Sequence, residues 1–223
     1  MRNTRTYSDP CGIARALDLV GERWALLVVR ELLLGPKRFT DLKTGLPGAS
    51  PNVLSQRLDE LEQAGIVQRR KLAPPASVWV YDLTEWGREL EPVLLALGRW
   101  GSRSASRPGG DLSVDALMIA LKTTFDPSAA EGLRATYQLR LSADHFQTAV
   151  NDGSIELRRG DVQHPDAVIE TDVATLRGLV YGDEQLDAVI GLGSVTIEGD
   201  RRAVERFLSL FPRPKPAQVV ATT

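Results

Sequence analysis

The segment from Ser50 to Gly65 most constrains the fold of this chain, because it contains the start, the end and both faces of one helix. Ser50 is a favoured N-cap residue, and Pro51 suits the first helical position, where its missing N–H costs nothing. Gly65 is typical of the position that ends a helix. An apolar stripe at helical spacing is formed by Leu54, Leu58 and Leu61. The segment therefore predicts a capped amphipathic helix.

The polar face of this helix carries side chains that bond base edges and phosphates. In its first two turns these are Asn52, Ser55, Gln56 and Arg57. A DNA-recognition helix reads bases with its N-terminal end, so the pattern predicts base contacts from this face. The same residues also fit a capped helix whose polar face contacts only solvent. The neighbouring segments help to decide between a DNA-reading helix and a merely solvated one.

The segment before this helix has the pattern of a first helix and a tight turn. Arg38 and Thr40 open a short amphipathic stretch that ends at Leu46, and the breaker Pro47-Gly48 follows. A short helix, a turn with glycine and a capped helix make a helix-turn-helix. In that arrangement we expect Arg38 and Thr40 to contact phosphates.

Two β-like runs, Ile66–Lys71 and Val78–Leu83, follow the predicted recognition helix. Pro74-Pro75 between them cannot continue a β-ladder, which favours a projecting loop. The first run carries three consecutive cations, Arg69, Arg70 and Lys71. We expect a two-stranded wing whose cations lie beside the phosphate backbone and supply sequence-independent affinity. A solvated edge strand is the alternative explanation of these charges.

Residues 11–101 resemble the HxlR family of bacterial winged-helix regulators. The resemblance rests on Cys11 and on the segments LDLVGERWALLVVRELLLGPKRFTDL (17–42), LPGASPNVLSQRLDELEQAGIVQRR (46–70) and VYDLTEWGRELEPVL (80–94). It implies a homodimer joined by the helices that flank the winged motif, with two recognition helices in successive major grooves of double-stranded DNA. The DNA-facing positions that it implies are Thr40, Ser50, Asn52, Ser55, Gln56 and Arg57, with wing contacts from Arg69 to Ser77.

The charge of the chain is unevenly distributed. The whole sequence of 223 residues has a net charge of −2, which does not by itself indicate nucleic-acid binding. Residues 1–107 hold 16 Lys and Arg against 12 Asp and Glu, a net +4, whereas residues 108–223 hold 11 against 17, a net −6. A basic front half and an acidic back half suit a DNA reader joined to a part that does not touch DNA.

The chain shows no signal for a membrane. It lacks a run of about eighteen apolar residues, the length that a spanning helix needs. Its first residues, MRNTRTYSDPC, lack the apolar core of a signal peptide. We therefore expect no membrane partner and a cytoplasmic location.

The segment Ser102–Gly110 is polar and punctuated by proline and glycine, which predicts a linker between two domains. Ahead of it, Thr84 is a candidate cap for a helix from Glu85 to Trp100. The predicted division is a winged helix-turn-helix DNA-binding and dimerisation domain at 1–101, the linker at 102–110, an α+β ligand-binding domain at 111–212 and a Pro-rich tail at 213–223.

After the linker, the pattern predicts an antiparallel sheet covered by helices, so the whole chain is of the α+β class. The turn Asn151-Asp152-Gly153 joins two of the alternating runs. The expected elements are a helix at Leu112–Lys122, strands around Tyr137–Leu141, Phe146–Val150, Ile155–Leu157 and Ala167–Thr171, a helix capped by Asp172, a helix at Glu184–Ile190, a strand at Val195–Glu198 and a helix capped by Asp200.

This half resembles the sterol carrier protein 2 fold, most clearly in DAVIETDVATLRGLVYGDEQLDAVIGLGSVTIEGDRRAVERFLSLF (166–211). The resemblance rests on the order of elements, and it implies an apolar cavity between sheet and helices that takes a small hydrophobic ligand. Ordinary core residues would show the same pattern. The candidate lining residues are Leu117, Leu121, Leu139, Leu141, Phe146, Ile169, Leu176, Leu179 and Ile190.

Catalytic patterns are missing from the sequence. His145 stands beside Asp144 at a strand start and His164 lies in a polar loop, so neither has a recognisable nucleophile partner. Gly191-Leu192-Gly193 lacks the third glycine and the lysine of a phosphate-binding loop. A single cysteine excludes an internal disulfide and any multi-cysteine zinc site. We therefore predict no enzymatic activity, no cofactor and no metal.

Cys11 is a candidate redox residue, because it lies just before a helix predicted from Ile13. Backbone N–H groups at a helix start stabilise a thiolate and raise its reactivity. In the family that this chain resembles, a cysteine near the N-terminus often serves as a thiol switch. With one cysteine per chain, a switch requires an intersubunit disulfide, a small-thiol mixed disulfide or alkylation. A small residue packed at the dimer interface is the alternative.

Together these features predict a homodimeric transcriptional regulator that reads a two-fold symmetric operator. A small hydrophobic ligand in the C-terminal domain is predicted to modulate it. Redox or electrophile sensing through Cys11 is one alternative. A lipid-binding, carrier-like protein, in which the winged helix only dimerises the chain, is another.

Overall fold

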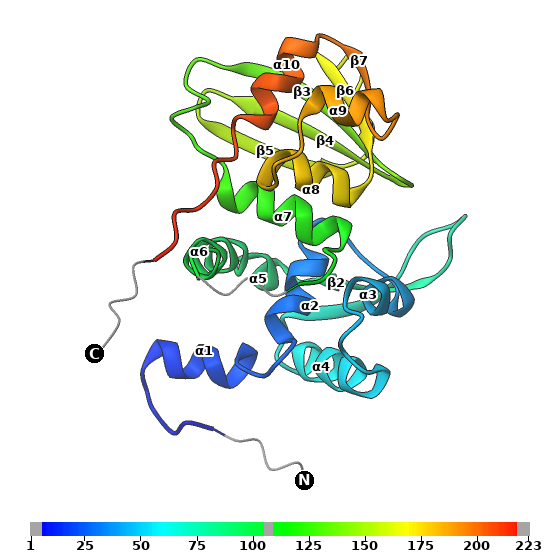
Figure 1. Ribbon diagram of the computed structural model, residues 1–223. Coiled ribbons are helices and arrows are strands. Elements are labelled where there is room, and N and C mark those ends of the chain that lie inside the picture. The colour runs from blue at the N-terminus through cyan, green and yellow to red at the C-terminus, as the bar shows by residue number, and fades with distance from the viewer. Residues whose placement is uncertain (1–5, 105–108, 218–223) are drawn as a thin grey trace. The chain divides into compact units, whose positions relative to one another are not determined.

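The computed structural model describes residues 6–104 and 109–217. The chain divides into two compact units, Met1–Leu94 and Leu95–Thr223, and the division falls within helix α6 (Glu91–Gly101). The first unit is built of helices and one hairpin, and the second contains a five-stranded sheet (Figure 1). Residues 105–108 of the predicted linker and residues 218–223 of the predicted tail lie outside the described ranges.

The first unit contains the predicted helix-turn-helix and wing. Its elements are α1 (Gly12–Val20), α2 (Ala25–Leu32), α3 (Phe39–Gly45), α4 (Pro51–Gln63), β1 (Val67–Lys71), β2 (Trp79–Leu83) and α5 (Glu85–Arg88). Helices α3 and α4 with the turn between them form the helix-turn-helix. Strands β1 and β2 pair antiparallel, and the loop between them projects from the unit (Figure 1).

Helix α4 begins and ends where the sequence predicts. The Ser50 hydroxyl oxygen accepts a hydrogen bond from the Val53 N–H at 3.3 Å, and Gly65 adopts a left-handed φ of 71° just after the helix. The three leucines of the apolar stripe, Leu54, Leu58 and Leu61, are buried in the core of the unit. The prediction of a capped amphipathic helix is confirmed.

The single helix predicted from Glu85 to Trp100 is wrong, because α5 ends at Arg88 and α6 begins at Glu91. Pro92 explains the break. Its ring clashes with the carbonyl group four residues earlier and it has no N–H to donate, so it is tolerated only in the first turn of a new helix. Thr84 caps α5 as predicted, since its hydroxyl oxygen accepts a hydrogen bond from the Gly87 N–H at 3.0 Å.

A buried carboxylate joins the wing to the helix-turn-helix. Glu31 in α2 is fully buried, and it pairs with Arg30 at 2.7 Å and with Lys37 at 3.2 Å. The backbone of Lys37 pairs in turn with that of Tyr81 in β2, at N···O distances of 2.9 and 2.8 Å. Gly45 at the end of α3 packs on the same carboxylate, because a Cβ there would lie 2.3 Å from Glu31 Oε2. Helices α2 and α3 and strand β2 therefore meet around one charge.

The second unit is a mixed sheet packed against helices. Its elements after α6 are α7 (Val114–Thr124), β3 (Arg134–Leu141), β4 (Asp144–Asn151), β5 (Ser154–Arg159), β6 (Ala167–Thr171), α8 (Val173–Tyr181), α9 (Leu186–Gly191), β7 (Thr196–Gly199) and α10 (Arg201–Leu208). The strand order is β5-β4-β3-β6-β7. Asp172 and Asp200 cap α8 and α10 as predicted, each accepting a hydrogen bond from a backbone N–H of the first turn.

The wholly antiparallel sheet predicted from the sequence is wrong at one pair, because β3 and β6 run parallel. The connection at 160–166 takes the chain from edge strand β5 past β4 and β3 to the far side of β3. It is held there by the Val162 N–H, which donates to the Gln138 side chain at 2.8 Å, and by the Asp166 N–H, which donates to the Thr136 carbonyl at 2.8 Å. Residue alternation predicts where strands lie, but not this crossover.

The residues predicted to line a cavity are core positions of the second unit. Helix α10 packs on β6 and β7, and α7 packs on β5. Leu117, Leu121, Leu139, Leu141, Phe146, Ile169 and Leu176 are fully buried, and Leu179 and Ile190 are half-buried. Ordinary packing and the lining of a ligand site account equally for this burial, so the cavity stays a prediction.

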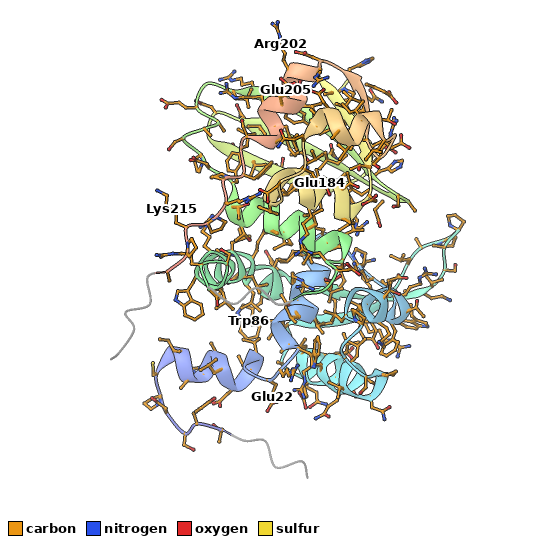
Figure 2. All side chains as sticks on the ribbon, in the orientation of Figure 1. Glu22, Trp86, Glu184, Arg202, Glu205 and Lys215 are labelled. Carbon is orange, nitrogen blue, oxygen red and sulfur yellow. The ribbon has the colours of Figure 1, made fainter. Side chains whose placement is uncertain are left out.

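The first part of the predicted tail is bound to the segment after α6. The Ala217 N–H donates to the Arg103 carbonyl at 2.8 Å, and Arg103 Nε donates to the carbonyl of Lys215, labelled in Figure 2, at 3.3 Å. Across residues 6–104 and 109–217, every helix is too short or too polar to cross a membrane.

Candidate nucleic-acid interface

The N-terminal half of α4 presents an exposed polar face. Ser50, Asn52, Ser55 and Gln56 are all exposed, as is Thr40 of α3. These side chains face solvent because the leucines on the other side of α4 occupy the core, and a helix of 3.6 residues per turn separates the two faces. The structure therefore brings together most of the residues that were predicted to read bases.

Arg57 is the exception, because it lies on the buried side of α4. It is 8% exposed, it forms an ion pair with Glu60, and its Nη1 lies 3.8 Å from Glu22 Oε2, a residue labelled in Figure 2. The prediction that Arg57 shares the exposed face is wrong. The sequence spacing already indicates burial of Arg57. It stands three residues after Leu54 and next to Leu58, which puts it on the apolar side of the helix.

Glu60 holds two side chains of the recognition helix. Gln56 Nε2 donates to Glu60 Oε1 at 2.9 Å, and the other oxygen of the same carboxylate accepts from Arg57. The Gln56 amide is therefore exposed and also oriented by the next turn of α4. Glu60 was not among the predicted site residues, although it stands at i+4 from Gln56 and i+3 from Arg57, the spacings of interacting helical neighbours.

Arg38 is exposed at the N-cap of α3, with its guanidinium engaged by Asp41. The carboxylate accepts hydrogen bonds from the Arg38 backbone N–H, from Nε and from Nη2, each at 3.0 Å. The hydrogen bonds from the guanidinium, together with the negative charge of Asp41, raise the pKa of Arg38 above its ordinary value. A phosphate at this position would compete with Asp41 for a side chain that is already ordered next to Thr40.

The wing cation Arg70 is bound within the first unit. Its Nε donates to Asp82 Oδ2 at 2.9 Å, and Arg88 Nη2 donates to Asp82 Oδ1 at 2.8 Å. Asp82 is buried, so both cations are needed to compensate its charge. The sequence predicts the same role for Arg70 as for its neighbours, but the hairpin register sets Arg70 opposite Val80, next to Asp82.

The other two wing cations flank an exposed tryptophan, Trp79, which was not among the predicted site residues. The guanidinium carbon of Arg69 lies 5.1 Å from the Trp79 ring centroid, and Lys71 is the register partner of Trp79. Arg69 stands opposite Tyr81, whose pKa is raised by burial and lowered in part by the charge of Arg69. Both cations are exposed.

Comparison with known proteins identifies the first unit. Residues 19–108 match the family model described as HxlR-like helix-turn-helix. The HTH-type transcriptional regulator YvaP of Bacillus subtilis (strain 168) is 39% identical over 89 residues, which are 40% of this chain and 82% of YvaP. The chain belongs to the HxlR-like helix-turn-helix family. This confirms the resemblance predicted for the first part of the sequence.

Other proteins similar to the HxlR-like unit have solved structures. The regulator YodB of Bacillus subtilis (strain 168) is 38% identical over 88 residues, which are 40% of this chain and 79% of YodB. Its quinone-bound crystal structure shows 35% identity and a TM-score of 0.36, covering 41% of this chain and 96% of that one. The redox regulator HypR in its oxidized form shows 33% identity and a TM-score of 0.38, covering 44% of this chain and 100% of that one.

The second half of the chain matches a different family model. Residues 109–222 match the one described as alkyl sulfatase C-terminal, so this half belongs to that family. The sec-alkylsulfatase Pisa1 from Pseudomonas sp. shares 20% identity with a TM-score of 0.46; the match covers 49% of this chain, which spans only 18% of Pisa1. The resemblance of this half to sterol carrier protein 2 stays a prediction.

Two buried hydroxyl groups in the second unit lack a hydrogen-bond partner among the described residues. They belong to Tyr137 and Thr148, which are fully buried and stand opposite each other on β3 and β4. The Tyr181 hydroxyl, in contrast, lies 2.6 Å from Thr124 Oγ1, and burial raises the pKa of Tyr181 to about 12. An unpaired buried hydroxyl is costly, so this pair is unusual.

The remaining candidate groups have simple surroundings. His145 Nδ1 lies 2.7 Å from Asp161 Oδ1 at the surface, and His164 is exposed. No group of three or more His, Cys, Asp or Glu side chains with metal-binding geometry occurs within the described ranges. Cys11 is exposed at the N-cap of α1, where its own N–H donates to Asp9 Oδ1 at 2.8 Å.

Because Arg57 is buried and paired, it should stabilise the first unit rather than read bases. We expect Arg57→Ala to lower the free energy of unfolding by about 1–3 kcal/mol, through lost packing and an uncompensated Glu60. Asn52→Ala, an exposed change on the same helix, should stay within about 0.5 kcal/mol of the unchanged protein. Urea unfolding followed by tryptophan fluorescence measures both. Equal, small effects would contradict the structural role of Arg57.

Proposed function

We propose that the chain is a homodimeric transcriptional regulator that binds a two-fold symmetric operator in double-stranded DNA through α4. The exposed N-terminal face of this helix, with Asn52, Ser55 and Gln56, is the observation that carries the proposal. Amide side chains there suit adenine edges, and hydroxyl groups suit bases or phosphates. Relatives in the family are named transcriptional regulators, which supports the same function.

Apolar side chains on the helices around the winged motif support dimerisation. Ile13 of α1 is 72% exposed and Val93, at the start of α6, is 53% exposed. The other large apolar side chains exposed on α1 and α5 are Leu17, Leu19 and Trp86. Trp86, labelled in Figure 2, also lines a pocket of about 220 Å³ with residues of α1. A second copy packed against these helices would remove apolar surface from water, and two-fold symmetry would match the operator.

Fluorescence anisotropy of the purified full chain tests this proposal. The chain is titrated onto duplex DNA from its own upstream region and onto a random duplex, across a salt series, and sedimentation equilibrium gives the number of subunits. We expect a dimer that prefers the upstream duplex and shows a steep salt dependence. Weak binding that is equal on both duplexes and on genomic fragments would contradict the proposal and favour the carrier-like alternative.

Gln56 should contribute to base recognition, because its amide is exposed and oriented by Glu60. We expect Gln56→Ala to weaken binding to the upstream duplex by about 1–3 kcal/mol while leaving binding to the random duplex unchanged. Gln63→Ala is the matched control, since Gln63 is an exposed glutamine at the far end of the same helix. Equal losses on both duplexes for Gln56→Ala would refute its role in base reading.

We further propose that the second unit modulates DNA binding by taking a small hydrophobic ligand. The unpaired hydroxyls of Tyr137 and Thr148 favour this, because a mostly apolar molecule with one polar group would satisfy them while its remainder stays buried. The resemblance to sterol carrier protein 2 and the match to the alkyl sulfatase C-terminal family support a module for apolar molecules. Such a ligand changes DNA binding only if its affinity differs between the DNA-bound and free forms.

In the absence of ligand, these two hydroxyl groups should cost stability. Tyr137→Phe and Thr148→Val keep the shape of each side chain and remove only its polar function. Each variant should therefore unfold at the same or a higher temperature, with a gain in the free energy of unfolding of up to about 1–3 kcal/mol. Tyr181→Phe is the control, because it removes a hydroxyl that is hydrogen bonded to Thr124 and should lower the unfolding temperature. Differential scanning calorimetry of the full chain compares them. Destabilisation by Tyr137→Phe and Thr148→Val would show that the hydroxyls are paired, and would remove this support for the ligand.

Electrophile sensing through Cys11 is a second candidate function. The exposed thiol at the N-cap of α1 favours it, as does similarity to quinone-bound YodB and oxidized HypR. In alkylation by 1,4-benzoquinone the sulfur forms one bond to a ring carbon, and the thiol hydrogen and the displaced ring hydrogen end on the two oxygens, giving a hydroquinone.

Quinone treatment should therefore release the unchanged protein from the upstream duplex, whereas Cys11→Ser should resist. Anisotropy before and after treatment measures the release, and mass spectrometry confirms a single adduct. Release of Cys11→Ser to the same extent would exclude this function without affecting the proposal for α4.

A further inference from the structure

The pocket beside Trp86 lies within the first unit, between α1 and α5. Its volume is about 220 Å³, and the buried residues Val20, at the end of α1, and Ile66, after α4, line it. Leu19 is 39% exposed and Trp86, labelled in Figure 2, is 50% exposed, so the pocket can be reached from solvent. Drug-sized ligands fill about 300–1,000 Å³. This pocket therefore suits a smaller molecule.

The lining of this pocket combines apolar side chains with one negative charge. Six of the seven lining side chains are apolar, and the seventh is Glu89. Glu89 is exposed, and no ion pair joins its carboxylate to a cation within residues 6–104 and 109–217. The adjacent arginine, Arg88, donates instead to Asp82 at 2.8 Å. The Glu89 carboxylate is therefore available to a ligand.

Trp86 adds an aromatic face next to this carboxylate. Glu89 is the C-cap of α5 and keeps a helical backbone, so it stands one turn after Trp86 on the same side of the helix. A carboxylate and an indole in one apolar pocket attract a positive charge in two ways, by Coulomb attraction and by the quadrupole of the ring. An anion would be repelled by Glu89, and a neutral apolar molecule would gain only from its burial. The lining therefore favours a cation with an apolar body.

The inner wall of the pocket is continuous with the end of α4. Ile66 directly follows Gly65, and its N–H donates to the Leu61 carbonyl at 2.9 Å. The Ile66 carbonyl accepts from the Thr84 N–H at 3.0 Å, just before α5. Gly87 packs on the same carbonyl, because a Cβ there would lie 2.1 Å from the Ile66 oxygen. A molecule against Ile66 therefore contacts the segment that fixes the end of α4 to the start of α5.

We infer that this pocket binds a small organic monocation, which is an effector of α4. Its apolar body packs on Leu19 and Ile66, and its charge lies between Glu89 and Trp86. A quaternary or protonated amine on an aliphatic or aromatic body has this chemistry. The binding step is independent of the proposed function, whereas the effect on DNA binding rests on it. That effect requires a difference in cation affinity between the DNA-bound and free forms.

NMR spectroscopy of the full chain tests binding at this site. The probe is phenyltrimethylammonium, compared with its neutral isostere tert-butylbenzene and with the anion benzenesulfonate. The indole N–H signal that Trp86→Phe removes identifies Trp86 among the four tryptophans. We expect the cation to shift this signal with a dissociation constant about tenfold lower than that of the neutral isostere, and the anion to leave the signal unchanged. Equal affinities for the cation and its isostere would overturn the inference.

Substitutions at exposed positions of α5 separate the charge from the apolar wall. Glu89→Gln keeps the size of the side chain, so it should weaken phenyltrimethylammonium binding about tenfold and leave tert-butylbenzene binding unchanged. Glu85→Gln is the matched control, since Glu85 is an exposed carboxylate of the same helix outside the pocket lining. Trp86→Leu removes the π face and should weaken the cation about three- to tenfold, measured by isothermal titration calorimetry. Equal losses for Glu89→Gln and Glu85→Gln would overturn the inference.

Failure of the inference and failure of the proposed function give different results. Saturating phenyltrimethylammonium should change the affinity for the upstream duplex by about fivefold or more, and Glu89→Gln should abolish this change. Cation binding without a change in DNA affinity would overturn the effector role. Cation binding by a protein that binds neither duplex would contradict the proposed function and support the site. DNA binding by a dimer whose Trp86 signal ignores the cation would identify the pocket as covered by the second copy and overturn only the inference.

Discussion

The DNA-reading unit depends on one carboxylate that is withdrawn from water. Glu31 is fully buried, and a buried charge is tolerated only when its partners stay in place. Arg30 and Lys37 supply that compensation, and the backbone of Lys37 pairs with β2 of the wing. Gly45 of α3 packs directly on the same carboxylate. The wing and the helix-turn-helix therefore both depend on the compensation of the Glu31 charge. Their mutual placement within the unit therefore rests on charge compensation as well as on the apolar core.

The same principle governs which cations remain free to meet a polyanion. The first 107 residues have a net charge of +4, but several of their arginines are engaged internally: Arg38 by Asp41, Arg57 by Glu60, and Arg70 by Asp82. Counting charges along the sequence therefore overstates the number of phosphate-binding groups. Of the three carboxylates only Asp82 is buried, so Arg70 is the cation that the fold itself requires most strictly.

The interior of the second unit contains both a paired charge and unpaired hydroxyl groups. An ion pair between buried Asp115 and half-buried Arg159, at 2.7 Å, joins α7 to β5. The hydroxyls of Tyr137 and Thr148, on neighbouring strands of the same sheet, are left unpaired. A fold that compensates its buried charges while leaving two adjacent hydroxyls unpaired keeps a polar position inside an otherwise apolar core. This makes the interior of the unit, rather than its surface histidines, the place to look for a bound molecule.

Residue order was enough for features that depend on neighbours along the chain. Ser50, the leucine stripe and Gly65 predicted α4, and alternation predicted the strands, because caps, helical spacing and pleating act over a few residues. Features that depend on distant partners needed the folded chain. Three such features join residues across strands or crossovers. They are the parallel pairing of β6 with β3, the ion pair of Arg70 with Asp82 and the stacking of Arg69 on Trp79. Arg57 combines both kinds of feature. Its spacing along the sequence puts it on the leucine stripe of α4. Only the folded structure shows that this charged side chain is buried there and paired with Glu60.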